Sequence, residues 1–284
     1  MTPSRMTMTD QPNPSYQSRN STLVAHRGGA GLWLENSLPA FRDAIEKKYP
    51  AIECDIQLTH DQKLLIYHDF TLNTLYTEIP VDLNAQSLIQ ELSASDIKKL
   101  ILVDLSHDIR SPIPFVEDLF DLLLQSKNRP FLFAEIKTSP AHHTQSHVEC
   151  LVDKLIALAE SYQYLDNMTL LSFDWRGLVY AQKKSSHIPL TFIYCDSTHE
   201  PRENNLWLGP YSFKNANIPF ALKDKGAALI SVPYHLMTIE FMKNCTEAGL
   251  KTNVWTVNTP DEITRFQALG VDYITTDFPN FFSE

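Results

Sequence analysis

The chain has 284 residues, of which 43% are hydrophobic, enough for one large domain or two small ones with a continuous core. Its 24 basic and 34 acidic residues give a formal net charge of −10, without runs of like charge, which argues against nucleic acid and anionic membrane surfaces as partners. No stretch reaches the roughly 18 apolar residues that cross a bilayer, so no integral membrane association is expected. These features favour a small-molecule ligand.

The N-terminal segment, residues 1–21, is rich in polar residues and proline and lacks the apolar core of a secretory signal. We expect a frayed tail there, followed by a single domain over residues 22–284. The four cysteines lie far apart, at Cys54, Cys150, Cys195 and Cys245. This spacing fits neither a disulfide framework nor a zinc site, which favours a cytoplasmic location. A periplasmic or secreted location stays open if a signal peptide has been removed, and no oligomeric state is indicated.

Short β-rich runs alternate with amphipathic stretches along the rest of the chain. Nine runs have strand character: Leu23–Ala25, Ile52–Leu58, Leu64–Tyr67, Phe131–Ile136, Met168–Phe173, Leu190–Cys195, Ala228–Val232, Asn253–Val257 and Tyr273–Thr276. The sharpest helix signal lies near the C-terminus, where Thr259, Pro260 and Glu262 form a capping box and Gly270 follows as the stop. The alternation predicts a parallel sheet, either open or closed as a (β/α)₈ TIM barrel.

One of the nine runs cannot belong to a parallel sheet. Leu64–Tyr67 follows Leu58 after only five residues, which is too short for a parallel crossover, so it must return antiparallel as a hairpin through Thr59–Lys63. The other eight runs fill a barrel. Residues from about 70 to 111 lose strand periodicity and carry one short helical pattern, Ala94–Leu100. The expected fold is therefore a (β/α)₈ barrel with a small insertion after a hairpin extension of the second strand.

Three carboxylates are expected at the carboxyl-terminal mouth of this barrel, where active sites of the fold lie. Glu53 and Asp55 share one face of their strand, and Glu135 ends the strand Phe131–Ile136. Such a cluster would repel itself unless something positive lay within it, and ligation by oxygen alone suits a hard cation. We therefore predict one divalent cation, Mg²⁺ or Ca²⁺.

Basic side chains are expected at the same mouth. His26 and Arg27 end the first strand, His68 ends the returning hairpin arm, and Lys137 follows Glu135. A hairpin turn near Asp61 makes paired residue numbers sum to about 121 to 123, so His68 reaches the level of the carboxylates. An odd sum places His68 on their face, whereas an even sum requires a bulge or bend after Tyr67.

These segments together resemble the glycerophosphodiester phosphodiesterase family from Val24 to Pro279. The matching segments are His26-Arg27-Gly28, Glu35-Asn36-Ser37, Glu53-Cys54-Asp55-Ile56, Leu58-Thr59-His60-Asp61, His68-Asp69, Glu135-Ile136-Lys137, Ser172-Phe173, Trp255-Thr256-Val257-Asn258 and Thr276-Asp277-Phe278-Pro279. The chain departs from the family pattern at Leu34, at Ser37 and after His199.

The resemblance implies metal-dependent hydrolysis of a small-molecule glycerophosphodiester to glycerol 3-phosphate and an alcohol. It implies catalytic roles for His26 and His68, which act as the acid and base pair. It further implies a cation on Glu53, Asp55 and Glu135 and substrate binding by the remaining three residues, Arg27, Lys137 and Trp255. Attack by the substrate's own glycerol hydroxyl, giving a cyclic phosphate, and direct attack by water both stay open.

Other interpretations of the same residues stay open at this point. The carboxylates could form a salt-bridge network without metal, Lys137 could form a Schiff base, Trp255 could be core, and the histidines at 142, 143 and 147 could chelate a metal. Among functions, hydrolysis of lysophospholipids in the manner of a phospholipase D would need an apolar groove, for which Ile101–Leu105 is the candidate. A remote alternative is a barrel that binds phosphate esters without turnover.

Overall fold

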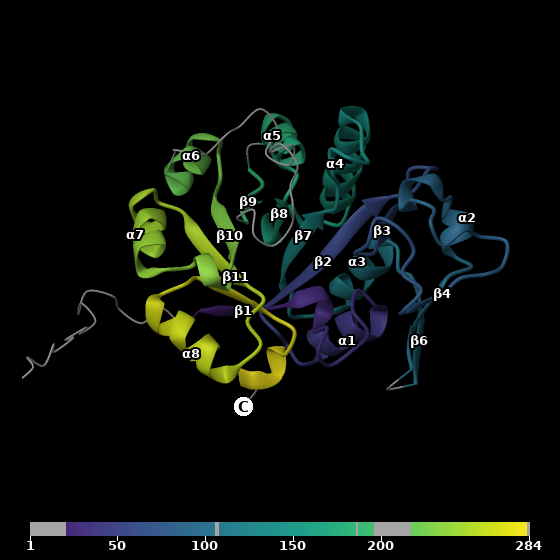
Figure 1. Ribbon diagram of the computed structural model, residues 1–284, viewed down its shortest axis with the longest axis horizontal. Coiled ribbons are helices and arrows are strands. Elements are labelled where there is room, and N and C mark those ends of the chain that lie inside the picture. The colour runs from purple at the N-terminus through teal and green to yellow at the C-terminus, as the bar shows by residue number, and fades with distance from the viewer. Residues whose placement is uncertain (1–20, 106–107, 186, 196–216, 283–284) are drawn as a thin grey trace, which may run out of the picture.

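The computed structural model describes residues 21–105, 108–185, 187–195 and 217–282. Its centre is a closed barrel of parallel strands, in which the first strand pairs with both the second and the last (Figure 1). The eight barrel strands are β1 (Thr22–Ala25), β2 (Ala51–Leu58), β7 (Phe131–Ile136), β8 (Met168–Ser172), β9 (Leu190–Ile193), β10 (Leu229–Pro233), β11 (Lys251–Trp255) and β12 (Tyr273–Thr276). The predicted (β/α)₈ barrel is thereby confirmed.

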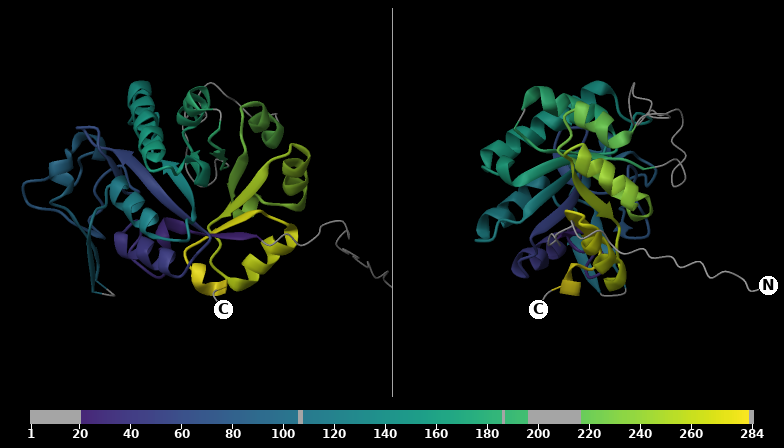
Figure 2. Two further views of the ribbon diagram at one scale, coloured as in Figure 1. Left: turned by 180° about the vertical axis from the view of Figure 1, so that it is seen from behind. Right: turned by 90° about the vertical axis from the view of Figure 1, so that its left-hand side faces the viewer.

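Helices connect the barrel strands and surround the barrel (Figure 2). They are α1 (Leu38–Glu46), α3 (Val116–Gln125), α4 (Gln145–Ser161), α5 (Trp175–Lys184), α6 (Ile218–Asp224), α7 (Ile239–Glu247) and α8 (Pro260–Leu269). Helix α8 begins and ends as predicted, because the Thr259 hydroxyl caps the Glu262 amide and Gly270 adopts a left-handed conformation with φ 84°. No helix in the described part of the chain is long and apolar enough to cross a membrane.

Two apolar layers hold the barrel. The larger lies between the strands and the surrounding helices and includes the fully buried Phe41, Phe120 and Trp175. A smaller cluster fills the barrel interior, where Phe133 packs with Leu171 and others from neighbouring strands. Both faces of each parallel strand are buried in this way, so the strands are rich in apolar residues. These apolar runs are the pattern from which the sequence predicted the strands.

The second strand continues past the barrel as a hairpin, as predicted. Strand β3 (Leu64–Ile66) pairs antiparallel with the end of β2, so that Leu58 lies opposite Leu64 and Ile56 opposite Ile66. Each pair sums to 122, within the expected range, but the sum is even. The consequence for His68 is described with the site.

The segment after the hairpin is more regular than the sequence indicated. It contains the short helix α2 (Ala94–Ile97), which agrees with the helical pattern, and a separate antiparallel sheet of β4 (Thr77–Glu78), β5 (Ile101–Asp104) and β6 (Ile109–Pro112). The expectation of no strands there was wrong, because these strands are short and partly exposed and so lack a clear alternation. An apolar cluster under this segment includes Leu65 and Tyr67 of the hairpin.

The expected tail, residues 1–21, lies outside the described residues except for Ser21. The Ser21 hydroxyl donates a hydrogen bond to the Val271 carbonyl oxygen at 2.6 Å. This bond ties the start of the described chain to the barrel beside β12.

Candidate active site

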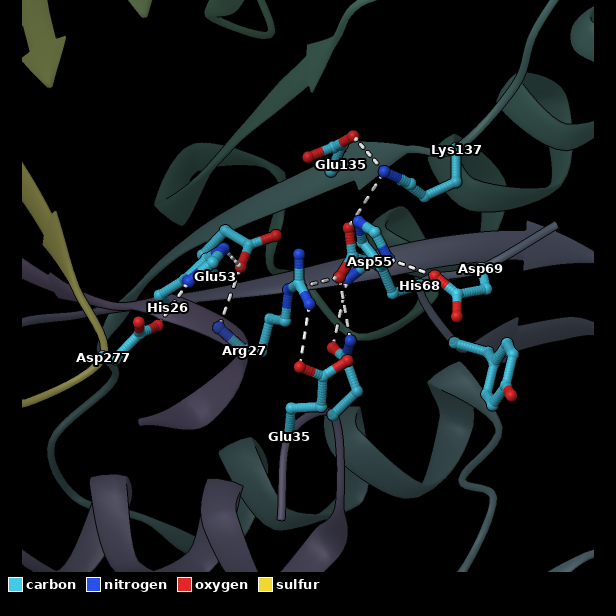
Figure 3. Close-up of polar contacts among 12 residues, drawn as sticks. His26, Arg27, Glu35, Glu53, Asp55, His68, Asp69, Glu135, Lys137 and Asp277 are labelled. Carbon is cyan, nitrogen blue, oxygen red and sulfur yellow. Dashed lines mark hydrogen bonds and ion pairs between the residues drawn. The ribbon is translucent and has the colours of Figure 1, made fainter. Parts of the chain in front are cut away.

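Three carboxylates converge at the mouth of the barrel, as predicted for the second strand and its neighbour (Figure 3). Asp55 of β2 lies directly opposite Glu135 of β7 in the parallel register, and Glu53 precedes Asp55 on the same face. One oxygen from each residue lies within 4.8 Å of the other two, and all three side chains are buried. The alternation of side chains along two adjacent strands is sufficient to produce this cluster.

Glu53 and Asp55 have pKa values that are shifted in opposite directions. Burial raises the pKa of Glu53 well above its ordinary value, and the negative charges of Asp55 and Glu135 raise it further. Burial would also raise the pKa of Asp55, but Arg27, Lys137 and the remaining neighbours outweigh it and hold that pKa below its ordinary value. Burial and repulsion therefore dominate at Glu53, whereas the neighbouring positive charges dominate at Asp55.

Arg27 and Lys137 supply positive charge beside the cluster. The Arg27 backbone N–H donates to Glu53 Oε2 at 2.8 Å, and its guanidinium Nε lies 3.3 Å from Asp55 Oδ2. The Lys137 ammonium lies 3.0 Å from Glu135 Oε1 and 3.7 Å from Asp55 Oδ1. Burial lowers the pKa of Lys137, but these two carboxylates more than compensate and raise it. A lysine held as an ammonium is a poor nucleophile, so the alternative of a Schiff base at Lys137 loses support.

The donor set fits a hard divalent cation. Glu53 Oε1 is buried and has no hydrogen-bond partner among the described residues, although a buried carboxylate oxygen without one is costly. The cluster also contains three acids against the two cationic side chains of Arg27 and Lys137. A cation bound by these oxygens would satisfy the unpaired atom and relieve the repulsion, and Mg²⁺ and Ca²⁺ prefer such ligands. A salt-bridge network without metal would leave Glu53 Oε1 unpaired and the excess negative charge unbalanced.

His26 is held by a carboxylate from the last strand. Its Nδ1 lies 2.6 Å from Oδ1 of Asp277, and its Nε2 lies 4.0 Å from Glu53 Oε2. Asp277 is fixed in turn by Asn258, whose amide donates to Oδ2 at 2.6 Å and whose Oδ1 accepts the Asp277 backbone N–H at 2.9 Å. Although burial raises the pKa of Asp277, its bond to His26 and its other partners lower it overall. Asp277 thus orients one ring nitrogen of His26 and leaves the other towards the carboxylates.

His68 reaches the site through a bend. Tyr67 still follows the hairpin, since its N–H donates to the Asp55 carbonyl oxygen at 3.0 Å, and an unbroken strand would place His68 opposite Cys54, facing away. The chain bends at residues 68–70 instead, and His68 lines the same cavity as Glu53 and Glu135. The sequence predicted either an odd sum or an even sum with a bulge or bend after Tyr67, and the structure has the second arrangement. His68 Nδ1 lies 2.7 Å from Asp69 Oδ1.

A cavity of about 530 Å³ opens above these residues. It is lined by seven of the eight predicted site residues: His26, Arg27, Glu53, His68, Glu135, Lys137 and Trp255. Asp55 is not among them, since it lies behind the lining and is 1% exposed. Trp255 also packs edge to face against Phe173, with ring centroids 5.7 Å apart, so it belongs both to the cavity wall and to the packing below it.

Sequence reasoning assigned no role to three residues that hold the predicted ones in place. These are Asp277, Asn36, whose amide donates to Asp55 Oδ2 at 2.8 Å, and the buried Gln57. Strand alternation places Gln57 on the same face as Asp55, two residues further on, but the bend that supplies its hydrogen-bond partners is not specified by this pattern. Asp277 directly follows the strand that closes the barrel next to His26.

The histidines at 142, 143 and 147 do not form a comparable centre. Nδ1 of His143 accepts the Ser139 backbone N–H at 3.0 Å, and its ring lies 4.7 Å from that of His147 between centroids. Burial lowers the pKa of His143 to about 3, with a further contribution from His147. Among the described residues, only the Glu53, Asp55 and Glu135 cluster brings three metal-ligating side chains together.

The carboxylate cluster predicts stabilisation by a divalent cation. Mg²⁺ or Ca²⁺ should raise the Tm of the metal-stripped protein, because a ligand that binds only the folded state stabilises it by about 2.7 kcal/mol when its free concentration is about 100 times its Kd. Glu53→Gln should abolish this rise and should leave the metal-free Tm unchanged or higher, since it removes repulsion. Thermal unfolding with and without EDTA measures both effects.

The exposed Glu46 of α1 provides a matched control, and Glu46→Gln should keep the full cation response. An equal rise in Tm for the Glu53→Gln and wild-type proteins would rule out the carboxylate cluster as the binding site.

Comparisons with known proteins agree with this geometry. The model of the glycerophosphoryl diester phosphodiesterase family matches residues 26–281. A glycerophosphodiester phosphodiesterase of Caldanaerobacter subterraneus is 26% identical over 260 residues, which cover 90% of this chain and 94% of the relative. The span of the family match includes every predicted site residue, from His26 to Trp255.

Solved structures share the fold. A candidate glycerophosphoryl diester phosphodiesterase of Silicibacter pomeroyi superposes with a TM-score of 0.79 at 23% identity, covering 92% of this chain and 91% of the other. An Oleispira antarctica phosphodiesterase, solved with its product sn-glycerol-3-phosphate, superposes with a TM-score of 0.72 at 18% identity, covering 91% and 93%. This chain therefore belongs to the glycerophosphoryl diester phosphodiesterase family and is a phosphodiesterase.

Proposed function

We propose that this enzyme hydrolyses glycerophosphodiesters to glycerol 3-phosphate and an alcohol, with His26 and His68 as the acid and base pair beside a bound divalent cation. One observation carries the proposal: two histidines, each paired with an aspartate, line one cavity together with Glu53 and Glu135. The family match and the product bound to the Oleispira relative support the substrate class.

Arg27 and Lys137 have the charge that a phosphodiester anion requires. Both line the cavity, and both are already beside carboxylates, which hold them as cations. A Mg²⁺ or Ca²⁺ ion held by Glu53, Asp55 and Glu135 would supply Lewis-acid polarisation of a phosphate oxygen. Arg27 and Lys137 then bind the phosphate oxygens and offset the negative charge that grows around phosphorus.

The two histidines divide the proton transfers. One removes a proton from the attacking hydroxyl as its oxygen bonds to phosphorus, and the other gives a proton to the alcohol oxygen as its bond to phosphorus breaks. In Figure 3 the His26–Asp277 and His68–Asp69 pairs lie at opposite ends of the carboxylate cluster, which suits transfers on two sides of phosphorus. The nucleophile is either water or the substrate's own glycerol hydroxyl. In the second case water then opens a cyclic phosphate.

The inner wall of the cavity suits a small polyol. Ser231, Asn253 and Thr275, from three adjacent strands, line one part of it, and the Asn253 amide donates to Ser231 Oγ at 2.8 Å while its oxygen accepts from Thr275 at 3.0 Å. Each hydroxyl and amide keeps further hydrogen-bonding capacity. Phe133 and Leu171 line another part. Glycerol hydroxyls can bind the polar part while the carbon chain contacts the apolar part.

Glycerophosphodiesters without acyl chains are favoured over lysophospholipids. The apolar groove expected along residues 101–105 is not part of the cavity lining, because Ile101–Asp104 form β5 in the small sheet and Leu102 packs in the cluster beneath it. Retention of both histidine–aspartate pairs also counts against a barrel that only binds phosphate esters.

Turnover assays test the proposal. We expect release of glycerol 3-phosphate from glycerophosphocholine and glycerophosphoethanolamine, slower release of choline from a lysophosphatidylcholine, and loss of all turnover after EDTA. An enzyme-coupled assay for glycerol 3-phosphate and metal analysis by mass spectrometry measure these outcomes. Full turnover in protein shown to contain no metal would contradict the cation, and exclusive turnover of the lysophospholipid would contradict the substrate class.

The acid and base pair predicts matched losses in two variants. His26→Ala and His68→Ala should each lower kcat by about 10² to 10⁴, the usual range for loss of a general acid or base. His60→Ala is a suitable control, because His60 is exposed in the turn of the hairpin that carries His68. Either variant retaining kcat within about threefold of wild type would exclude that histidine from proton transfer.

A further inference from the structure

Gln57 fixes the main chain on both sides of His68. The Gln57 side chain is 2% exposed, and its amide nitrogen donates to the Tyr67 carbonyl oxygen and to the Asp69 carbonyl oxygen, each at 2.7 Å. Both amide hydrogens are thus used on the residues that flank His68. Because the even hairpin register would turn His68 away from the site, these two bonds hold the bend that reverses its direction.

A second set of hydrogen bonds, made through Asp69, fixes the side chain of His68. Asp69, which pairs with His68 through Oδ1, accepts hydrogen bonds at Oδ2 from the Asn73 amide at 2.6 Å and the Tyr76 hydroxyl at 2.8 Å. The bond to His68 lowers the pKa of Asp69 most, and the bonds from Asn73 and Tyr76 lower it further. Asn73 and Tyr76 belong to the insertion, and the Tyr76 carbonyl accepts from Val103 of β5. The insertion is therefore connected to the His68 ring.

Neither Gln57 nor Tyr76 can act on the substrate directly. Both are absent from the residues that line the cavity, and their hydrogen bonds go to the main chain around His68 and to Asp69. These hydrogen bonds connect them to the cavity through His68 and its partner Asp69. A misplacement of about 1 Å in a reacting group can cost about 10²-fold in rate, so such support matters.

We propose that Gln57 and Tyr76 are positioning residues for His68, and that the insertion is needed for the orientation of this histidine. The inference rests on the proposed role of His68 in proton transfer. It assigns to the insertion a contribution to kcat that does not involve contact with substrate.

Two single variants test this inference. Gln57→Met keeps the length of the side chain and removes both bonds, and we expect kcat to fall by about 10- to 10²-fold. Tyr76→Phe removes one hydroxyl and should lower kcat by about 3- to 10-fold. In both, KM and the Kd for Mg²⁺ from calorimetry should stay within about threefold of wild type, since the phosphate and cation ligands are untouched.

Asn167 offers a matched control far from the mouth. Its amide also donates to two main-chain carbonyls, those of Arg129 and Pro130, each at 2.9 Å, at the opposite end of β7. Asn167→Leu likewise removes two hydrogen bonds from one amide to main-chain carbonyls, and it should lower Tm without lowering kcat. Tyr76→Phe keeps the test valid if Gln57→Met proves unable to fold, as judged by circular dichroism.

Double variants separate positioning from general loss of structure. If Gln57 and Tyr76 act through His68, then Gln57→Met or Tyr76→Phe in the His68→Ala enzyme should cause no further loss of kcat. If the losses of kcat in the single variants multiply in the double variant, the inference is overturned. A Gln57→Met enzyme with kcat within about twofold of wild type, as expected for Asn167→Leu, would also overturn it. A His68→Ala enzyme with wild-type activity would instead overturn the proposed function, so the two failures are distinguishable.

Discussion

Mutual repulsion of three buried carboxylates at the mouth of the barrel is the constraint on which the rest of the site depends. Glu53, Asp55 and Glu135 are brought together by the pairing of β2 with β7, which the fold itself requires. Arg27 and Lys137 offset part of the charge, and burial together with the remaining negative charge raises the pKa of Glu53. The divalent cation that we propose would complete the balance, because the repulsion that destabilises the metal-free cluster would give it affinity for such an ion.

The closure of the barrel places a histidine–aspartate pair at each end of this cluster. His26 and Asp277 are 251 residues apart in sequence and meet because β1 pairs with β12. His68 and Asp69 are adjacent in sequence, but they reach the site only through the hairpin and its bend. The first pair depends on the pairing of two barrel strands, whereas the second depends on side chains of the extension and the insertion. If His68 transfers a proton as we propose, variation of the insertion would change kcat without altering the phosphate or cation ligands.

The sequence predicted the features that follow from periodicity. The eight barrel strands, the hairpin and the carboxylates of β2 were readable because buried parallel strands are apolar and side chains alternate along them. The small sheet of the insertion was missed, since Thr77–Glu78 is only two residues long and Ile109–Pro112 carries polar residues. The roles of Asp277 and Gln57 were missed for another reason. They depend on which side chains meet after closure and on a bend that local propensity does not specify.

Anomalous diffraction from crystals grown with Mn²⁺ and glycerol 3-phosphate tests the central claim most directly. One anomalous peak should lie between oxygens of Glu53, Asp55 and Glu135, with the phosphate beside it near Arg27 and Lys137 and the imidazoles of His26 and His68 on two sides of phosphorus. A peak elsewhere in a protein that turns over glycerophosphodiesters, or a phosphate out of reach of both histidines, would contradict the account.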